Sequence, residues 1–266
     1  QRLHVALEEN RFCLYSQEIA PLVGETDDRH IEILLRLQDE NGRLIYPDSF
    51  IPAAERYGLM TSIDRWVVEN VFKVISECSA LGSDQPMAMC AINLSGSTIG
   101  DEDFLQFLHE QFACYGVAPE RVCFEITETS AISNLGSAIR FINDLKGLGC
   151  HFSLDDFCAG MSSFAYLKHL PVDFLKIDGS FVKDMLDDPI NRAMVEVINH
   201  IGHVMGKRTI AEFVESPQIE QALIEIGVDY AQGYIIERPR LFTSDSLLSR
   251  PKRSWPLALK APGSLR

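Results

Sequence analysis

Two adjacent carboxylates, Asp155 and Asp156, follow a short apolar run at residues 151–154 near the middle of the chain. The run is bounded by Gly149 and is rich in strand-forming residues, so it predicts a buried strand that ends at the two carboxylates. Two like charges side by side resist burial, and a cation is therefore expected beside them. A solvated turn carries such a pair equally well, so the pair has meaning only if other strands repeat the pattern.

Other predicted strands do repeat it, because each carries a polar residue near its C-terminal end. These residues are Glu32, Asn93, Glu125, Asp155 with Asp156, Lys176, Glu212 and Gln232. Each residue alone is explained by an exposed strand end or a helix cap. Seven strand ends that share the property indicate instead one common site, at the face of a barrel where parallel strands end.

The side chains of this set favour one kind of chemistry. Five carboxylates and one amide oxygen are hard ligands, which suit Mg²⁺ or Mn²⁺ better than zinc. So many carboxylates would over-charge the surroundings of one ion, whereas two ions roughly 3.5–4 Å apart can share a bridging carboxylate. Lys176 adds one cation that can orient a water molecule or neutralise developing charge. The residues therefore predict a metal-dependent hydrolase of a phosphate ester.

Strands and helices alternate along the chain as such a site requires. The patterns predict strands at residues 12–19, 30–37, 87–94, 122–127, 151–154, 174–177, 209–214 and 230–235, with the longer helices at 64–77, 101–115, 135–148, 189–205 and 217–226. About eight strands in about 250 residues indicate an α/β fold, a TIM-like (β/α)8 barrel, with an open doubly wound sheet as the alternative. No linker divides residues 1–245, which form one predicted domain. The chain beyond Pro239 is expected to pack loosely, with residues 246–266 as a loosely ordered tail.

The totals exclude several classes of protein. The 266 residues carry a formal net charge of −14, which repels DNA, RNA and anionic lipid. An anionic substrate stays compatible if metal ions invert the local charge. The seven cysteines form no CxxC pair, which indicates reduced thiols and a cytoplasmic domain. The chain has no membrane-spanning apolar stretch, signal pattern or initiator Met, so we expect a domain of a longer signalling protein, whose other parts could anchor it in the inner membrane.

A series of short motifs adds a family resemblance to this interpretation. The motifs are Gln17-Glu18-Ile19, Glu32-Ile33-Leu34, Asn93-Leu94-Ser95, Glu125-Ile126-Thr127-Glu128, Asp155-Asp156-Phe157, Lys176-Ile177-Asp178, the AEFVE string at residues 211–215, and Gln232-Gly233-Tyr234. In their order and spacing they resemble the EAL domain, the bacterial cyclic di-GMP phosphodiesterase, over about residues 1–240. Any one string is weak evidence, but the set together is specific.

The resemblance implies a barrel whose first strand runs antiparallel to the others, and it implies roles for the motif residues. Ligands of a first Mg²⁺ or Mn²⁺ ion would be Glu32, Asn93, Glu125 and Asp155, and those of a second ion Asp155, Asp156 and Glu212. Lys176 would position the attacking water, and Glu128 would hold the loop at 157–163 that presents the aspartates. Expected substrate contacts are Gln17, Arg36 and Gln232, with Asp178 ranked below them.

The implied reaction is hydrolysis of cyclic di-GMP to linear pGpG by a two-metal attack on phosphorus. Ca²⁺ should inhibit it, because Ca²⁺ prefers looser coordination than a Mg²⁺ site offers. A homodimer and N-terminal GGDEF-type or sensory domains are the expected partners. The rival interpretation is a receptor that binds cyclic di-GMP without hydrolysing it, and an unrelated metal-dependent barrel enzyme is a third. Because the chain keeps every ligand carboxylate and Lys176, catalysis is favoured.

Several residues depart from the family pattern close to the expected site. In the loop after the aspartates, Cys158, Ala159 and Met161 stand where the family usually has Gly, Thr and Tyr. Phe213 stands at a common glycine position, and Glu18 replaces a proline beside the expected guanine contact. A residue other than glycine stiffens a loop or changes its path where φ must be positive. Cys158 could act as a redox switch, although an inert thiol is the favoured interpretation.

Overall fold

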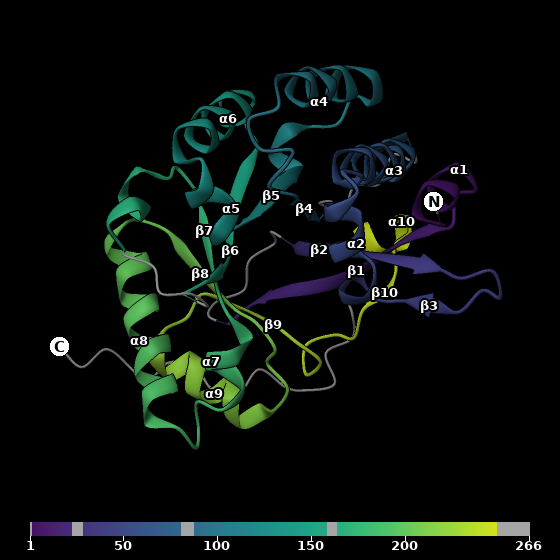
Figure 1. Cartoon of the computed structure of the whole chain (residues 1–266). Coiled ribbons are helices and arrows are strands. Elements are labelled where there is room, and N and C mark those ends of the chain that lie inside the picture. Colours follow the sequence, from purple (N-terminus) through teal and green to yellow (C-terminus); the bar gives the residue numbers. More distant parts are fainter. Residues whose placement is uncertain (1, 23–28, 81–87, 159–163, 249–266) are drawn as a thin grey trace.

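A closed barrel lies at the centre of the computed structural model, which describes residues 2–22, 29–80, 88–158 and 164–248 (Figure 1). Within these residues the barrel wall consists of eight strands: β1 (Phe12–Pro21), β2 (His30–Gln38), β4 (Met89–Leu94), β5 (Val122–Thr127), β6 (His151–Phe157), β7 (Phe174–Ile177), β8 (Arg208–Ala211) and β9 (Tyr230–Gln232). Neighbours from β2 to β9 run parallel, whereas β1 pairs antiparallel with both β2 and β9 and closes the wall. The predicted barrel with an antiparallel first strand is confirmed, and the open-sheet alternative is wrong.

Helices follow most of the strands and cover the outside of the wall (Figure 1). In the described ranges they are α1 (Arg2–Glu8), α2 (Ile51–Arg56), α3 (Met60–Ala80), α4 (Glu102–Tyr115), α5 (Glu128–Ser133), α6 (Leu135–Leu148), α7 (Gly179–Lys183), α8 (Pro189–Val204), α9 (Pro217–Ile226) and α10 (Ser244–Leu248), with 3₁₀ helices η1 (Pro47–Ser49), η2 (Pro119–Arg121) and η3 (Phe164–His169). Local sequence fixes their ends: the Asp101 carboxylate accepts hydrogen bonds from two N–H groups at the start of α4, and Gly149 ends α6 at positive φ.

No helix in these ranges combines the length and apolar character that crossing a membrane requires.

Two strands that carry site residues differ from their predicted bounds. β6 continues beyond Leu154 through both aspartates, and its pairing with β7 is irregular at this point. A bulge of this kind bends a strand and redirects its side chains. β8 ends at Ala211, so Glu212 follows the strand instead of lying within it.

The position of Glu32 was predicted wrongly. Glu32 is the third residue of β2 and not a residue near its C-terminal end. β2 continues because it forms a long hairpin with β1, with the ladder running from Ile19↔His30 to Phe12↔Leu37, and β3 (Leu44–Ile45) extends it further. In Figure 1 the outer part of this hairpin projects away from the barrel. The apolar run at residues 30–37 therefore covers the whole hairpin strand, of which only the first part belongs to the barrel wall.

The chain beyond Pro239 is packed more tightly than the sequence predicts. β10 (Arg240–Leu241) pairs with β1, and Leu247 in α10 is fully buried. The buried Arg29 guanidinium donates hydrogen bonds to the carbonyl oxygens of Ser246 and Leu247, at 3.3 and 2.9 Å. A two-residue strand and a five-residue helix are too short to show a periodic pattern, so the sequence gives no sign of them. Residues 249–266 of the predicted tail lie outside the described residues.

The barrel interior divides into layers along its axis. A cluster of buried side chains crosses the middle, formed by Ile19, Ala91, Cys123, Phe174, Ile210 and Tyr230. The motif residues lie on one side of this cluster, two positions further toward the C-terminal end of each parallel strand. Because successive residues of a strand point to opposite faces, that spacing returns the side chain to the interior. The larger core fills the space between the wall and the helices.

Candidate metal-dependent active site

Lys176 lies at the centre of the site, with its side chain 1% exposed. Its Nζ is 2.9 Å from Glu212, 3.1 Å from Glu125, 3.2 Å from Asp155 and 3.3 Å from Glu32. Burial alone would lower the pKa of Lys176, but the four carboxylates outweigh it and hold the pKa well above its usual value. The structure thus brings residues from four strands, and Glu212 from just after a fifth, together around one ammonium ion.

Glu32 is held in place by amide side chains as well as by Lys176. Asn93 Nδ2 donates to Glu32 Oε1 at 2.7 Å, and Gln232 Nε2 donates to Glu32 Oε2 at 2.6 Å. Gln232 Nε2 also lies 3.1 Å from Gln17 Oε1. Burial would raise the pKa of Glu32, but Lys176 and these hydrogen bonds outweigh it and lower the pKa. Glu32 therefore remains a carboxylate despite its burial.

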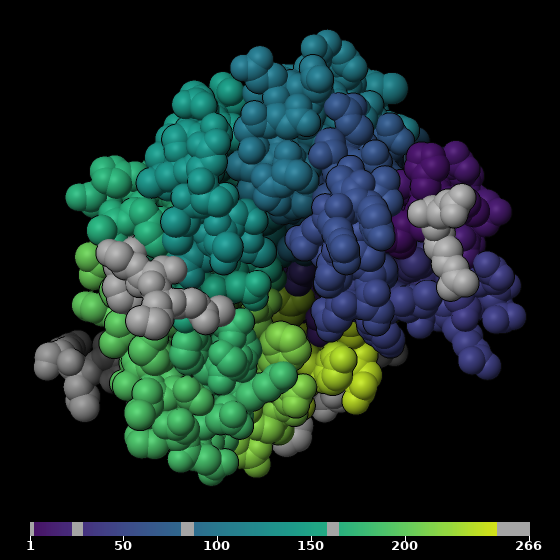
Figure 2. Space-filling view, in the orientation of Figure 1, coloured from purple at the N-terminus to yellow at the C-terminus, as the bar shows by residue number. Residues whose placement is uncertain are grey.

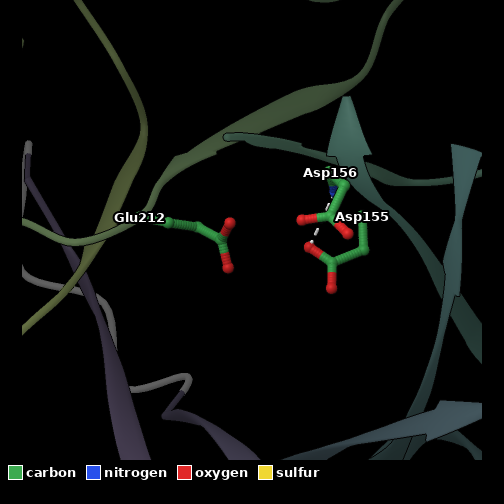
Figure 3. A group of neighbouring side chains, drawn as sticks. All are labelled: Asp155, Asp156 and Glu212. Carbon is green, nitrogen blue, oxygen red and sulfur yellow. Dashed lines mark hydrogen bonds between the residues drawn. The ribbon is translucent and has the colours of Figure 1, made fainter. Parts of the chain in front are cut away.

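A second group of acids lies beside the lysine. One carboxylate oxygen from each of Asp155, Asp156 and Glu212 lies within 4.8 Å of the others. Figure 3 shows the Glu212 side chain pointing across the barrel mouth toward the two aspartates. Burial and the neighbouring Asp155 raise the pKa of Asp156 to about 6. Burial and the nearby carboxylates likewise raise the pKa of Glu212 to about 8, against the effect of Lys176.

The donor set fits a hard divalent cation. All the candidate ligands offer oxygen atoms, and the raised pKa values show that these carboxylates lack sufficient positive charge nearby. Glu125 is fully buried, and its Oε1 has no hydrogen-bond partner among the described residues. A buried acceptor without a partner is rare in native proteins unless an ion or water serves it. The acidic cluster is therefore where such an ion fits.

Glu128 connects the start of α5 to the loop after β6. Its carboxylate accepts a hydrogen bond from the Cys158 backbone N–H at 3.0 Å and another from the Tyr166 hydroxyl group. Glu128 thus contacts the beginning of the loop that it is expected to hold. Ala159 and Met161 lie outside the described residues. Tyr166 was missed by the sequence analysis, because a tyrosine in a short 3₁₀ helix has no distinguishing pattern.

Asp64 is a second residue that the sequence analysis missed. This buried α3 carboxylate accepts hydrogen bonds from Ser95 N (3.0 Å), Ser95 Oγ (2.6 Å) and Thr98 Oγ1 (2.5 Å). It thereby holds the turn that follows Asn93. One signal could have found it, since Asp64 is a charged residue on the otherwise apolar face of α3, three positions before Val67.

The backbone around the second acid group is strained at three residues. Asp156, Cys158 and Phe213 have positive φ values of 53°, 67° and 54°. Cys158 and Phe213 stand where the family usually has glycine. Both positions have positive φ, so a residue other than glycine costs conformational strain there. Burial and Glu128 raise the pKa of the Cys158 thiol to about 12, which favours an inert thiol over a redox switch.

Phe213 also shapes the rim of the site. A Cβ built on Gly179 would overlap its ring, so only glycine fits beneath it. Lys183 Nζ lies 4.1 Å from the ring centroid on the other side, at the distance of a cation–π contact. The ring is 49% exposed, and it stands next to Glu212 where a substrate would enter.

The expected substrate contacts gather at one cavity of about 250 Å³. Its lining includes Gln17, Arg36 and Gln232 together with Glu32, Glu212 and Tyr234. The space-filling view shows this face of the molecule hollowed near its middle (Figure 2). The Arg36 guanidinium lies 5.0 Å from the Tyr46 ring centroid, which fixes it at the edge of the cavity.

Asp178 and Glu18 have partners that the sequence does not indicate. The Asp178 carboxylate caps α7 by accepting from Ser180 N at 2.8 Å, and it raises the pKa of Asp156. No contact with Lys176 is found for it within the described residues. Glu18 points out of the barrel and pairs with Arg29 at 2.7 Å.

The family model of the EAL domain matches residues 1–239. The chain belongs to the EAL domain family. It is 42% identical over 243 residues to cyclic di-GMP phosphodiesterase PdeB of Shewanella oneidensis, a match that covers 91% of this chain and 28% of the relative. It is 38% identical to cyclic di-GMP phosphodiesterase PdeF of Escherichia coli, with 90% of this chain and 31% of the relative covered. This EAL domain therefore spans less than a third of either relative.

Solved structures of EAL domains share the fold. The FimX EAL domain of Pseudomonas aeruginosa bound to cyclic di-GMP matches with a TM-score of 0.81 and 34% identity, covering 89% of this chain and 94% of that one. The PaMucR phosphodiesterase in complex with cyclic di-GMP matches with a TM-score of 0.82 and 28% identity, covering 90% of this chain and 96% of that one. Phosphodiesterases of this family depend on metal ions, and the acidic cluster of this EAL domain is where such ions fit.

Proposed function

We propose that this EAL domain hydrolyses one phosphodiester bond of cyclic di-GMP to give linear pGpG, using two Mg²⁺ or Mn²⁺ ions. The observation that supports the proposal most is the buried Lys176 ammonium group within 3.3 Å of four carboxylates, beside the Asp155, Asp156 and Glu212 group. A receptor has no need to keep this costly arrangement of buried charges. The names of the relatives and the nucleotide bound in the solved EAL domains support the choice of substrate.

The donor atoms divide into two ligand sets. The first ion would be held by Glu32, Asn93, Glu125 and Asp155, and the second by Asp155, Asp156 and Glu212. Asn93 suits this role because its Nδ2 already donates to Glu32, which leaves its amide oxygen for a cation. Ions bound there would draw charge from the phosphoryl oxygens and lower the pKa of a bound water molecule.

The side chains of this domain would perform the remaining tasks. Lys176 would hold the attacking water in line with phosphorus and offset the charge that develops on the phosphoryl oxygens. Glu128 would keep the backbone at Cys158 in place, so that the two aspartates keep their direction. Gln17, Arg36 and Gln232 would hold the nucleotide at the cavity rim.

The test is a product assay on the purified domain. Cyclic di-GMP is incubated with Mg²⁺ or Mn²⁺, with and without chelator, and the products are separated. Asp155→Ala and Glu32→Ala should abolish pGpG formation while nucleotide binding partly survives, and Glu128→Ala should weaken turnover through the loop. Glu120→Ala, at an exposed carboxylate on the opposite end of the barrel, is the control and should leave turnover unchanged.

The outcomes separate the two functions. Metal-dependent turnover that persists in Asp155→Ala contradicts the ligand assignment. Tight nucleotide binding by the unaltered domain without turnover supports the receptor instead, with the strained Cys158 and Phe213 positions as the cause. Added Ca²⁺ should reduce turnover in Mg²⁺, because it prefers a larger and looser coordination shell.

The proposal extends to the protein of which this domain forms part. Relatives more than three times as long as the matched region support N-terminal GGDEF-type or sensory domains as partners. The seven free cysteines support a cytoplasmic setting, in a parent protein that could be anchored in the inner membrane. A homodimer formed through the barrel is the expected assembly. Light scattering on the purified domain tests it, and a monomer at all protein concentrations contradicts it.

A further inference from the structure

A second cavity, of about 670 Å³, lies at the end of the barrel opposite the acidic site. Six of its lining residues are the first residues of their strands: His30, Met89, His151, Phe174, Arg208 and Tyr230. We call it the N-terminal cavity. The apolar cluster across the barrel interior separates it from Lys176 and the acids, so it is not part of the site described above. No role in hydrolysis requires a cavity here, and active sites of such barrels lie at the other end.

His30 contributes two ring nitrogens, without hydrogen-bond partners in the described part of the chain, to the wall of the N-terminal cavity. The side chain points into the barrel, because it precedes Glu32 by two positions on β2, and it is 2% exposed. Neither ring nitrogen has a hydrogen-bond partner among the described residues. Ring nitrogens of histidine donate or accept hydrogen bonds, and native structures seldom leave such buried groups unpaired.

The charges at the mouth of the N-terminal cavity favour an anion. Arg208 donates to the uncharged Tyr230 hydroxyl at 2.7 Å, and no ion pair to a carboxylate is found for it within the described residues. Asp173 is already engaged by Lys146 at 2.5 Å and by the Phe152 N–H at 2.9 Å. The lining also holds Arg121 and Arg29 with the exposed carboxylate of Glu120, and Arg29 is already paired with Glu18 at 2.7 Å. Arg208 is therefore the guanidinium group that this mouth offers to an anion.

Aromatic rings form the inner part of the same wall. The Phe174 and Tyr230 ring centroids are 6.0 Å apart, and His30 lies 5.3 Å from Phe174 and 6.5 Å from Tyr230. The rings meet at steep angles, so their faces and edges together form an apolar surface at the end of the cavity. Apolar surface with a few convergent polar groups is the usual composition of a small-molecule site.

We propose that the N-terminal cavity binds a small organic anion, namely a planar aromatic body that carries one phosphate or carboxylate group. Arg208 receives the anionic group at the mouth. The aromatic body packs against Tyr230 and Phe174. A polar atom of the ligand, or a water molecule held by it, pairs with His30. This site is independent of the proposed hydrolysis and does not rest on it.

The test uses phenyl phosphate as the probe, on the intact domain in the presence of chelator. The chelator keeps divalent ions, and hence phosphate, out of the acidic site. The ¹H–¹⁵N resonances of the His30 ring are followed during the titration, together with the temperature of unfolding. Phosphate alone and phenol alone carry one half of the probe each, and benzoate compares a carboxylate with the phosphate.

Phenyl phosphate should shift the His30 resonances in a saturable way and raise the unfolding temperature, with a weaker effect from either half alone. Arg208→Gln should weaken binding about tenfold, the loss expected for a hydrogen bond to a charged group. The matched control is Arg192→Gln, which removes an exposed arginine of α8 and should bind as tightly as the unaltered domain.

Two results would overturn the proposal. His30 resonances that do not move with phenyl phosphate or benzoate show that the ring is served by ordered water only. Equal binding by the Arg208→Gln and Arg192→Gln variants shows that the anion binds elsewhere on the surface. Because Arg208 is exposed, its replacement leaves the fold intact, and the result can be interpreted in either case.

Discussion

Each end of the barrel buries a lysine, and the two lysines have opposite surroundings. Lys176, at the C-terminal end, is surrounded by four carboxylates that hold its pKa well above the usual value. Lys207, at the N-terminal end, donates to the carbonyl oxygens of Leu170 and Val172 at 2.8 and 2.9 Å, and burial lowers its pKa. Burial is thus common to both, and the partners decide in which direction the pKa moves.

The surroundings of the two lysines fit a proposed role in chemistry for Lys176 and a role in the fold for Lys207. The carbonyl partners of Lys207 belong to the turn before β7, so its hydrogen bonds join two neighbouring segments of the wall. The partners of Lys176 come from four different strands or strand ends and repel one another without it. Structural requirements explain Lys207 fully, whereas only a ligand or a reaction explains four carboxylates around Lys176.

Replacing each lysine with methionine should give the largest contrast. Lys176→Met removes the group proposed to position water, so turnover of cyclic di-GMP should fall by at least about 100-fold in Mg²⁺. Lys207→Met leaves two carbonyl oxygens without a donor, so the free energy of unfolding should fall by roughly 1–3 kcal/mol with turnover retained. Product assays and urea denaturation of both variants measure this. A folded Lys207→Met variant without turnover would show that the comparison is mistaken.

The carboxylates of the two ends should differ in their response to acid. Burial would raise the pKa of Asp173, but His151, Lys146 and the Phe152 N–H outweigh it and lower the pKa to about 2, from 3.8. A lowered folded-state pKa contributes stability above the unfolded value and loses it as the pH falls from about 4 to about 2. Asp173→Asn should therefore cost about 2 kcal/mol at neutral pH and nearly nothing at pH 2.

Urea denaturation over a series of pH values measures this difference, with Asp144→Asn, at an exposed carboxylate of α6, as the control. An equal loss of stability for Asp173→Asn at pH 7 and at pH 2 would mean that the ionised Asp173 carboxylate and its ion pair with Lys146 do not stabilise this end of the barrel.

The smallest effect concerns the strained backbone. At the N-terminal end the positive-φ positions just before β6 and β9 are glycines, Gly149 and Gly227, whereas Asp156, Cys158 and Phe213 occupy such positions at the C-terminal end. Cys158→Gly should be more stable than Cys158→Ala by about 1 kcal/mol, because only glycine adopts this φ without strain. Thermal unfolding of both variants decides it. If Cys158→Ala is the more stable, the backbone at this position is not strained.

Much of the site could be predicted because its residues occur at the ends of recognisable strands. Asp155, Glu125 and Asn93 each follow an apolar run, and a parallel barrel brings such ends together wherever they occur in the chain. The central position of Lys176 could not be predicted, since it depends on the lengths of four side chains that meet in space. Glu32 was assigned to the right site from the wrong end of its strand, because a long hairpin hides where the barrel begins.

Other features depend on contacts that no local pattern records. Tyr166, in a 3₁₀ helix, and Asp64, in an outer helix, contact segments next to the site through hydrogen bonds to residues 38 and 31 positions away. Leu247 is buried although its helix is only five residues long, because Arg29 binds its carbonyl oxygen from the other end of the chain. The N-terminal cavity is formed by strand starts, where histidine and arginine look like ordinary solvated residues.

The antiparallel pairing of β1 with β9 affects how the domain folds while the ribosome synthesises it. The wall closes only when β1 meets β9, and the Gln17–Gln232 hydrogen bond joins residues 215 positions apart. Until β9 has been synthesised, the edge of β1 that later pairs with β9 stays unpaired. Chaperones and other chains can bind this edge during that time. Contacts so distant in sequence also slow folding. The acidic site can therefore be completed only after nearly the whole domain has been translated, and a nascent chain released early holds no active enzyme.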